Sequence, residues 1–164
     1  MQEISLDSEN ELSDIAAEVD HLRRSLARVQ GSLPARGTHE GWEAVHICAS
    51  ATEKIYTGVE RVMSMIATGV DGGAVGRSDG WHVALLKRMS HAVLGVRPAV
   101  LSPDCYARLD RLRAFRHRER NTYGLDLDFD VVIARSAEAI EAFTLFRREV
   151  GSFLDAIDPA DPRA

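Results

Sequence analysis

The stretch SENELSDIAAEVDHLRRSLARVQGSL, residues 8–33, decides the fold class of this chain. Its apolar residues recur at alternating steps of three and four, which is the spacing of a heptad seam along one face of an α-helix. Ser8 and Glu11 have the spacing of a capping box at the start of this helix, and Gly31 and Pro34 mark its end. The pattern predicts a long helix that packs lengthwise against a partner. The residues predicted to face that partner are Leu12, Ile15, Val19, Leu22, Leu26, Val29 and Leu33.

Two later stretches repeat the same spacing. In residues 40–66 the apolar stripe is widened by Ile55 and Val62, which favours burial inside a helical bundle over a free coiled coil. The seam residues of this helix are Trp42, Val45, Ala49, Thr52, Tyr56, Val59, Met63 and Ile66. The last helix is expected to be capped by Asp126 or Asp128. Its seam residues are Val132, Ala139, Phe143, Phe146, Val150 and Phe153.

The glycine-rich segment GVDGGAVGRSDG, residues 69–80, follows the second helix. A Walker-type phosphate loop would need glycine at position 71 and lysine at position 77, where the chain has Asp71 and Arg77. No predicted strand precedes the segment either. A flexible connector is therefore the better interpretation.

Two further helices are predicted between this connector and the last helix. A short one is expected over residues 81–93, with Asp79 as its N-cap. A longer one is expected over residues 103–122, because Ser102 suits the N-cap and is followed by proline, and Gly124 suits a left-handed C-cap. The residues predicted to face the core are Trp81, Leu85 and Met89 in the short helix and Tyr106, Leu109, Leu112 and Phe115 in the longer one.

Together these patterns predict an all-α chain, folded as an antiparallel four-helix bundle with one additional short helix. With 164 residues, 45% of them hydrophobic and 27% charged, the chain has the size and composition of a single helical domain. We expect that domain over residues 1–157, with a disordered tail over residues 158–164. Sparse cysteines, the lack of an apolar leader and the lack of a membrane-length apolar run favour the cytoplasm.

Residues 108–124, RLDRLRAFRHRERNTYG, form a basic island in a chain whose net charge is −5. Six arginines and one histidine lie on a single predicted helix, and residues four apart share a face of it, as Arg116 and Arg120 do. One interpretation is structural. The island would then be a solvated helix end whose arginines pair with Glu119 and with the acids of residues 126–130.

The composition of the island also suits phosphodiester chemistry without a metal or a cofactor. Arginine forks bind phosphate oxygens bidentately, and a histidine such as His117 can hold or pass a proton near neutral pH. Tyr123 follows Asn121 by two residues and adds a phenol at the end of the helix. This composition supports a second interpretation, a site for a phosphodiester, beside the structural one.

The other histidines carry weaker signals. His39, Glu43 and His46 share one helix face and could in principle bind a metal, but they lack a fourth ligand, so a polar face beside the core is favoured. His82 and His91 are expected to be ordinary hydrogen-bonded residues of the short helix.

The run FRHRERNTYG, residues 115–124, resembles the signature of HEPN-domain proteins. It is most similar to that of the HepT-like ribonuclease toxins, whose motif is Arg-x4-His-x-Tyr with a polar residue directly after the arginine. The resemblance extends to residues 56–61, 79–82 and 101–103, and it covers roughly residues 40–155.

This resemblance implies a homodimer that places two motifs in one cleft and cleaves RNA without a metal, through attack of the 2′-hydroxyl to give a 2′,3′-cyclic phosphate. It also implies an MNT-type nucleotidyltransferase antitoxin that adenylylates the motif tyrosine. By position, Arg116 would stabilise the phosphorane charge, His117 would be the polar second residue and Tyr123 would be the modified residue. Arg113 and Arg120 would contact RNA phosphates.

One position departs from the motif, because Asn121 stands where the family has its catalytic histidine. An amide has no titratable proton, and general acid–base catalysis contributes about 10²–10⁴-fold to a rate. The resemblance therefore predicts a toxin scaffold that keeps its RNA-binding and dimer surfaces while its nuclease activity is largely lost. A natural inactive copy and a deliberate substitution both fit the sequence. The alternative is a non-catalytic binding or regulatory protein whose basic helix recognises an acidic partner.

Overall fold

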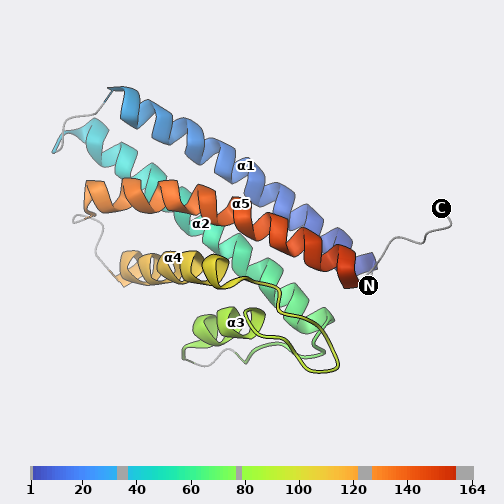
Figure 1. Cartoon of the computed structure of the whole chain (residues 1–164). Helices are drawn as coiled ribbons and strands as arrows, with labels where there is room; N and C mark the ends of the chain where they lie inside the picture. The colour runs from blue at the N-terminus through green and yellow to red at the C-terminus, as the bar shows by residue number, and fades with distance from the viewer. Residues whose placement is uncertain (1, 33–36, 77–78, 122–126, 158–164) are drawn as a thin grey trace, which may run out of the picture.

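The computed structural model describes residues 2–32, 37–76, 79–121 and 127–157, with only the backbone described for residues 2, 3, 32 and 118–121. These ranges contain five α-helices and no strand (Figure 1), so the predicted all-α class is confirmed. The helices are α1 (Gln2–Ser32), α2 (His39–Gly69), α3 (Trp81–Met89), α4 (Pro103–Asn121) and α5 (Phe129–Ile157). No described helix combines the length and the hydrophobicity needed to cross a bilayer. The tail predicted over residues 158–164 lies outside the described ranges.

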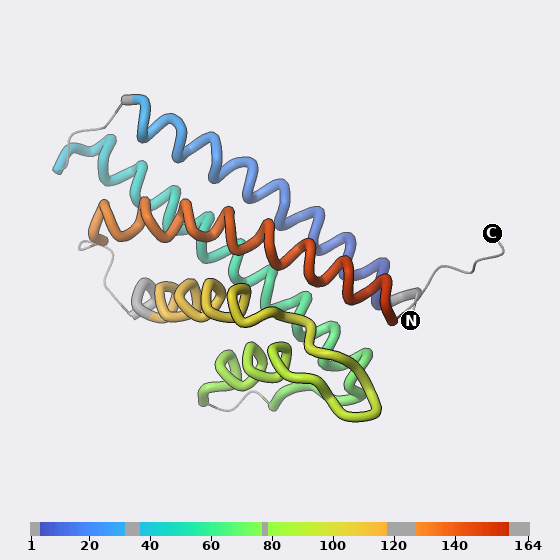
Figure 2. Tube along the Cα trace, viewed as in Figure 1, coloured from blue at the N-terminus to red at the C-terminus, as the bar shows by residue number. Residues whose placement is uncertain are grey.

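Helix α2 is the centre of the molecule, because it contacts each of the other four helices. Helix α1 packs along α2 in the opposite direction, and α5 lies against both of them (Figure 1). Helix α4 packs on α2 and α5, and the short α3 contacts α2 and α4. The colour gradient of Figure 2 shows that the chain reverses direction between α1 and α2 and again between α4 and α5.

The buried core follows the predicted seams. The seam residues of α1 are buried as far as the structure describes them, which leaves out Leu33. Those of α5 are all buried, and those of α2 are buried except for Trp42. In α3 and α4 the predicted inward residues are buried, apart from Trp81 and Tyr106, which are partly buried against the core.

Trp42 was expected in the core, and this prediction is wrong. Its side chain is 47% exposed, because the inward stripe of α2 begins at Gly41 and Val45 instead. The indole packs against its own helix. Its ring centroid lies 5.9 Å from that of His39 and 4.1 Å from that of His46.

The predicted capping box at Ser8 is also wrong, because α1 already begins at Gln2. Ser8 is fully buried within the helix, and its hydroxyl has no hydrogen-bond partner among the described atoms. The early turns are held by packing: the side chain of Ile4 lies so close to Gly69 of α2 that a Cβ there would be 2.2 Å from Ile4 Cδ1.

Helix α3 differs from its prediction at both ends. Its N-cap is Gly80, in the left-handed conformation with φ 82°, which glycine adopts without strain, and no side chain caps the helix as Asp79 was expected to do. The helix ends at Met89, before the predicted Val93. The carbonyl of Met89 accepts a hydrogen bond from the amide of Val100 at 2.9 Å, in place of an amide one turn further along the helix.

Two predicted N-caps are confirmed. The amide of Cys105 donates to Ser102 Oγ at 3.2 Å at the start of α4. Asp128 Oδ1 accepts hydrogen bonds from the amides of Asp130 at 2.9 Å and Val131 at 3.1 Å at the start of α5. Ser102 and Asp128 therefore cap the first turns of α4 and α5, as predicted. The C-cap predicted at Gly124 lies outside the described residues.

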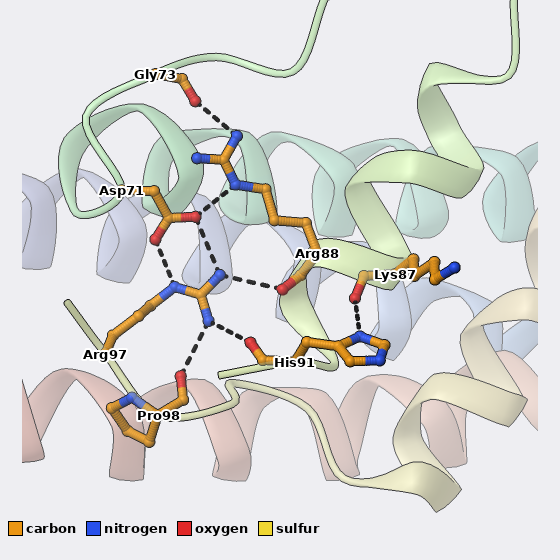
Figure 3. A network of polar contacts seen from close by, with 7 residues as sticks. All are labelled: Asp71, Gly73, Lys87, Arg88, His91, Arg97 and Pro98. Carbon is orange, nitrogen blue, oxygen red and sulfur yellow. Dashed lines mark hydrogen bonds and ion pairs between the residues drawn. The ribbon is translucent and has the colours of Figure 1, made fainter. Parts of the chain in front are cut away.

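A buried ion network fixes the segments on either side of α3 (Figure 3). Arg97 Nε donates to Asp71 Oδ1 at 2.5 Å, and Arg97 Nη2 donates to Asp71 Oδ2 at 3.0 Å. Arg88 Nε donates to the same Oδ2 at 2.6 Å. Both Asp71 and Arg97 have fully buried side chains. Burial alone would raise the pKa of Asp71, but the hydrogen bonds from the two arginines outweigh it and the pKa is lowered.

The remaining donors of this network satisfy backbone carbonyls. Arg97 donates to the carbonyls of Arg88, His91 and Pro98, at distances between 2.9 and 3.1 Å. Arg88 Nη1 donates to the carbonyl of Gly73 at 2.9 Å. The glycine-rich connector was expected to be flexible, but its described part is anchored through Asp71 and Gly73.

Gly58 marks the closest approach of α1 and α2. A Cβ at this position would lie 2.5 Å from Ile15 Cγ1, which is buried and near its own backbone. We therefore expect Gly58→Ala to lower the free energy of unfolding by about 1–3 kcal/mol, although alanine is the better helix former. Gly151→Ala in α5 is the matched control, because nothing lies within 4 Å of its Cβ position. Urea denaturation in which Gly58→Ala is as stable as Gly151→Ala would contradict this account.

Candidate functional site

Glu60 lies where α2, α3 and α4 meet. Its side chain is only 5% exposed, and a buried carboxylate needs cationic or hydrogen-bonding partners to offset its lost hydration. Both of its oxygens are engaged. Oε2 accepts a hydrogen bond from Arg116 Nη1 at 2.8 Å, and Oε1 is in contact with His82 Nδ1. We refer to Glu53, Tyr56, Glu60, His82 and Arg116 as the Glu60 cluster.

The spacing of residues on α2 builds one wall of this cluster. Glu53, Tyr56 and Glu60 are separated by three and four positions, so they share one face of the helix. Helix α4, which packs against α2, supplies Arg116. Helix α3, which contacts both, supplies His82. The cluster therefore joins three helices whose cluster residues are distant in sequence.

Arg116 is held by α2 more than by its own helix. Its side chain is 12% exposed, and its Nε lies 3.8 Å from Glu53 Oε1 without forming a hydrogen bond. The guanidinium carbon lies 6.0 Å from the centroid of the Tyr56 ring, within the range of a cation–π contact. A guanidinium carries five N–H donors, and the bond to Glu60 uses one of them. Among the described residues, the other four donors have no hydrogen-bond partner, and the one on Nε is buried.

Tyr56 lies beneath this guanidinium as a neutral phenol. Burial, and after it the charge of Glu60, raises the pKa of Tyr56 well above its usual value, while Arg113 and Arg116 act in the opposite direction. The hydroxyl is buried and has no hydrogen-bond partner among the described atoms. The buried ring thus packs beside the arginine as an uncharged side chain.

His82 forms the outer side of the cluster. Its side chain is 31% exposed, and its ring centroid lies 3.8 Å from that of Trp81, with the planes inclined by 32°. The contact between Nδ1 and Glu60 fixes the second edge of the ring. The imidazole is therefore held on two sides and reaches solvent on another.

Other arginines of α4 are engaged in ion pairs. The pairs are Arg108 with Asp104 and Glu141, Arg111 with Glu138, and Arg113 with Asp110. For these three arginines, the contacts support the interpretation of the basic island as a structural helix surface held by ion pairs. Their described partners lie on α4 and α5 and are not the acids expected from the sequence. Arg113, a predicted phosphate contact, donates from Nε to Asp110 at 2.8 Å.

The remaining predicted site residues follow Arg116 along the chain. His117 is exposed on α4, and Asn121 is the last residue of that helix. The side chains of Arg120 and Asn121 and the whole of Tyr123 lie outside the described residues. Within the described part of the motif, the structure brings Arg116 into the Glu60 cluster and leaves His117 on the surface.

Sequence reasoning missed Glu53, Glu60 and His82. Glu60 carried a usable signal, because it adjoins the apolar seam of α2 where an acid must have a partner. Glu53 carried no such signal, since an acid on a helix face is ordinarily solvated. His82 was interpreted as an ordinary hydrogen-bonded histidine, and its partner is the buried Glu60.

The remaining candidate residues are the histidines at the start of α2 and the two cysteines. His39 Nε2 lies 3.3 Å from Glu43 Oε1, and among the described residues no group of histidines, cysteines and acids is suited to hold a metal. Cys48 and Cys105 are buried free thiols. Burial raises the pKa of both, and Glu149 raises that of Cys105 further.

The fold and this site together define an all-helical protein whose basic helix carries one arginine bound to a buried acid. A family model described as HepT-like protein matches residues 48–157, which is more than half of the chain and includes most of α2 and all of α3, α4 and α5. The chain therefore belongs to the HepT-like family of HEPN-domain proteins, as the resemblance of residues 115–124 predicted. A comparison with curated proteins found no match.

Proposed function

We propose that this protein is a HepT-like toxin scaffold that binds RNA and carries the parts of a metal-independent endoribonuclease, with cleavage reduced by Asn121. The observation that carries the proposal is the placement of Arg116 on the buried Glu60. A structural arginine on a helix surface is ordinarily solvated, whereas this one is 12% exposed and oriented by three residues of α2. Such an arrangement suits the binding of one phosphate in a defined position.

The proposed roles follow from the chemistry of each group. Arg116 offers its remaining N–H donors to two non-bridging oxygens of a phosphodiester and stabilises the charge of the phosphorane. The 2′-hydroxyl of the neighbouring ribose attacks phosphorus, and the products carry a 2′,3′-cyclic phosphate and a 5′-hydroxyl. Tyr56 supports the guanidinium from below. An amide at position 121 cannot move the proton that this reaction transfers.

The family membership supports the proposed assembly. The scaffold is a four-helix bundle of α1, α2, α4 and α5, with α3 as the additional short helix. Two copies associate so that their motifs share one cleft, and a nucleotidyltransferase antitoxin modifies Tyr123 by adenylylation in the cytoplasm. Attachment of a nucleotide two residues beyond Asn121 would add negative charge beside the arginines and oppose RNA binding.

RNA binding tests this proposal. We expect Arg116→Ala to weaken the binding of a labelled single-stranded RNA by about ten- to hundredfold, since hydrogen bonds to charged groups contribute about 1.5–3 kcal/mol each. Fluorescence anisotropy at fixed salt measures the change. Arg111→Ala is the matched control, because it removes the same charge from the same helix but from an arginine paired with Glu138. We expect it to change the dissociation constant by less than about threefold.

Arg116→Ala also leaves the buried Glu60 with one partner fewer and could weaken RNA binding by destabilising the fold. A second variant therefore separates loss of the RNA contact from loss of stability. Arg116→Lys keeps a cation for Glu60 but loses the planar fork, and we expect it to bind RNA nearly as weakly as the alanine variant while it stays folded. If Arg116→Ala and Arg111→Ala lose the same RNA affinity, the effect of Arg116 is due to the overall charge of the helix and not to a specific phosphate contact. Unchanged affinity in Arg116→Lys and Arg116→Ala would remove Arg116 from the RNA site.

A further inference from the structure

We propose that His82 on α3 is a general base for RNA cleavage in this chain, held in place by Glu60 beside the phosphate-binding Arg116. The inference rests on the proposed function and assigns the proton transfer to a residue outside the basic helix. It concerns the residual cleavage by the chain with Asn121 in place. The motif lacks a titratable group at that position, and His82 is the imidazole that the fold places at the same carboxylate as Arg116.

The geometry fixes which nitrogen of His82 is free to act. An ionised carboxylate has no hydrogen to donate, so the contact between Nδ1 and Glu60 Oε1 requires the proton on Nδ1. The lone pair then lies on Nε2, for which the described part of the chain provides no hydrogen-bond partner. The side chain is 31% exposed, so the imidazole reaches the surface of the cluster. Trp81 packs on the ring and limits its rotation.

The second carboxylate oxygen of Glu60 holds Arg116, the proposed phosphate-binding residue of the site. Oε2 binds Arg116 Nη1 at 2.8 Å, so one carboxylate positions both the imidazole and the guanidinium. A phosphate on the free edge of Arg116 would therefore lie near the open edge of His82. In this arrangement Glu60 orients the base and stabilises the imidazolium that forms, as a carboxylate does for a catalytic histidine in other enzymes.

The proposed step balances without a metal or a cofactor. His82 Nε2 takes the proton of the 2′-hydroxyl while the bond between O2′ and phosphorus forms, and Arg116 stabilises the charge on the non-bridging oxygens. The bond between phosphorus and O5′ then breaks, and O5′ takes a proton from water. The imidazolium returns its proton to the hydroxide left behind, which restores the neutral ring.

The other histidines near this region fit the role less well. His117 follows Arg116 directly, so its side chain projects about 100° away around the helix. His91 lies beyond the C-terminal end of α3, and its Nδ1 lies 2.7 Å from the carbonyl of Lys87, with which it forms a hydrogen bond. His82, in contrast, contacts Glu60 directly.

Cleavage of a fluorogenic single-stranded RNA in EDTA, by the full chain with Asn121 in place, tests the proposal. We expect His82→Ala to lower the rate by about a hundredfold or more, and added imidazole to restore it by about tenfold or more. A merely structural histidine would show no such rescue. His91→Ala is the matched control, and we expect its rate to stay within about twofold of the unmodified chain, with no response to imidazole.

A second variant separates loss of the base from loss of the fold. His82→Asn keeps an amide donor for Glu60 and removes the proton acceptor, so we expect it to lose cleavage while its melting temperature stays close to that of the unmodified chain. Unchanged cleavage in His82→Asn would overturn the proposal, and so would a loss in His82→Ala that imidazole fails to restore. A rate that falls in His117→Ala but not in His82→Ala would do the same.

The outcomes also distinguish this inference from the proposed function. If Asn121→His cleaves RNA and the chain with Asn121 does not, the nuclease scaffold stands and the role of His82 fails. If Arg116→Ala and Arg116→Lys bind RNA as tightly as the unmodified chain, the proposed function fails at its first step. Loss of cleavage in His82→Asn with unchanged RNA affinity supports both.

Discussion

Replacing Asn121 by histidine is expected to raise the rate of RNA cleavage in EDTA by about 10²–10⁴-fold, the usual contribution of a general acid or base. Asn121 ends α4, five residues beyond Arg116, at the position that the resemblance of residues 115–124 pairs with the histidine of the HepT-like motif. Both side chains present a hydrogen-bonding nitrogen of similar reach, so the substitution adds a titratable proton with little change in shape. Single-turnover cleavage, with the 2′,3′-cyclic phosphate identified at the product ends, measures the effect.

The matched control for this variant is Asn121→Gln, which keeps an amide and should leave the rate within about threefold of the unmodified chain, because no titratable group is gained. The gain in Asn121→His should also depend on pH between about 5 and 8, the range in which an imidazole changes charge. Adding Arg116→Ala should remove most of it. If Asn121→His and Asn121→Gln cleave RNA equally slowly, the hypothesis that residue 121 is the missing proton-transfer position is wrong.

The long helices were predictable because a heptad seam leaves little choice of partner face. The seams of α1 and α5 place their described residues in the core without exception. Trp42 keeps the spacing of the α2 seam, yet its side chain is exposed, because the inward stripe there begins at Gly41 and Val45. Periodicity identifies a face, and the neighbouring helices decide how far along that face burial extends.

Helix ends were predictable only where the cap is local. Ser102 and Asp128 bind amides within three residues of themselves, so sequence alone was sufficient. The start of α1 was misplaced because packing of Ile4 on Gly69 carries the helix past its apparent cap at Ser8, and that contact is long-range. The starts of α4 and α5, which local hydrogen bonds set, were therefore found, whereas the start of α1 and both ends of α3 were not.

The candidate site divides in the same way. Arg116 was identifiable because its motif is continuous in sequence. Glu60 and His82 lie 56 and 34 positions before it, and only the packing of α2, α3 and α4 brings the three together. The buried position of Glu60 implied a cationic partner but could not specify which one. The roles of residues that act through tertiary contacts therefore required the structure.

The buried network around α3 gives the second large expectation. Replacing Arg97 by methionine is expected to lower the free energy of unfolding by about 3–5 kcal/mol, the usual cost of removing one partner of a buried ion pair. Arg97 is fully buried, and its loss would leave Asp71 with Arg88 alone and would also leave the carbonyls of His91 and Pro98 without their donor. Urea denaturation followed by circular dichroism measures the change.

The contribution of Asp71 should also depend on pH. Its pKa is lowered in the folded protein, so the stability that it contributes is fully present above the pKa of an unfolded aspartate, about 3.9. That stability is lost as the pH falls through the lower pKa of the folded state. The difference in free energy of unfolding between the unmodified chain and Asp71→Asn should therefore stay constant near neutral pH and shrink in acid.

Arg61→Met is the control for Arg97→Met, because Arg61 also pairs with an acid, Glu11 at 3.3 Å, but its side chain is 65% exposed. We expect that change to cost only about 0–1 kcal/mol. The double variant Asp71→Leu with Arg97→Met should cost less than the sum of the two single changes, since both buried charges are removed together. Additive costs, or equal costs for Arg61→Met and Arg97→Met, would mean that the burial of this ion pair does not control the stability of the segments around α3.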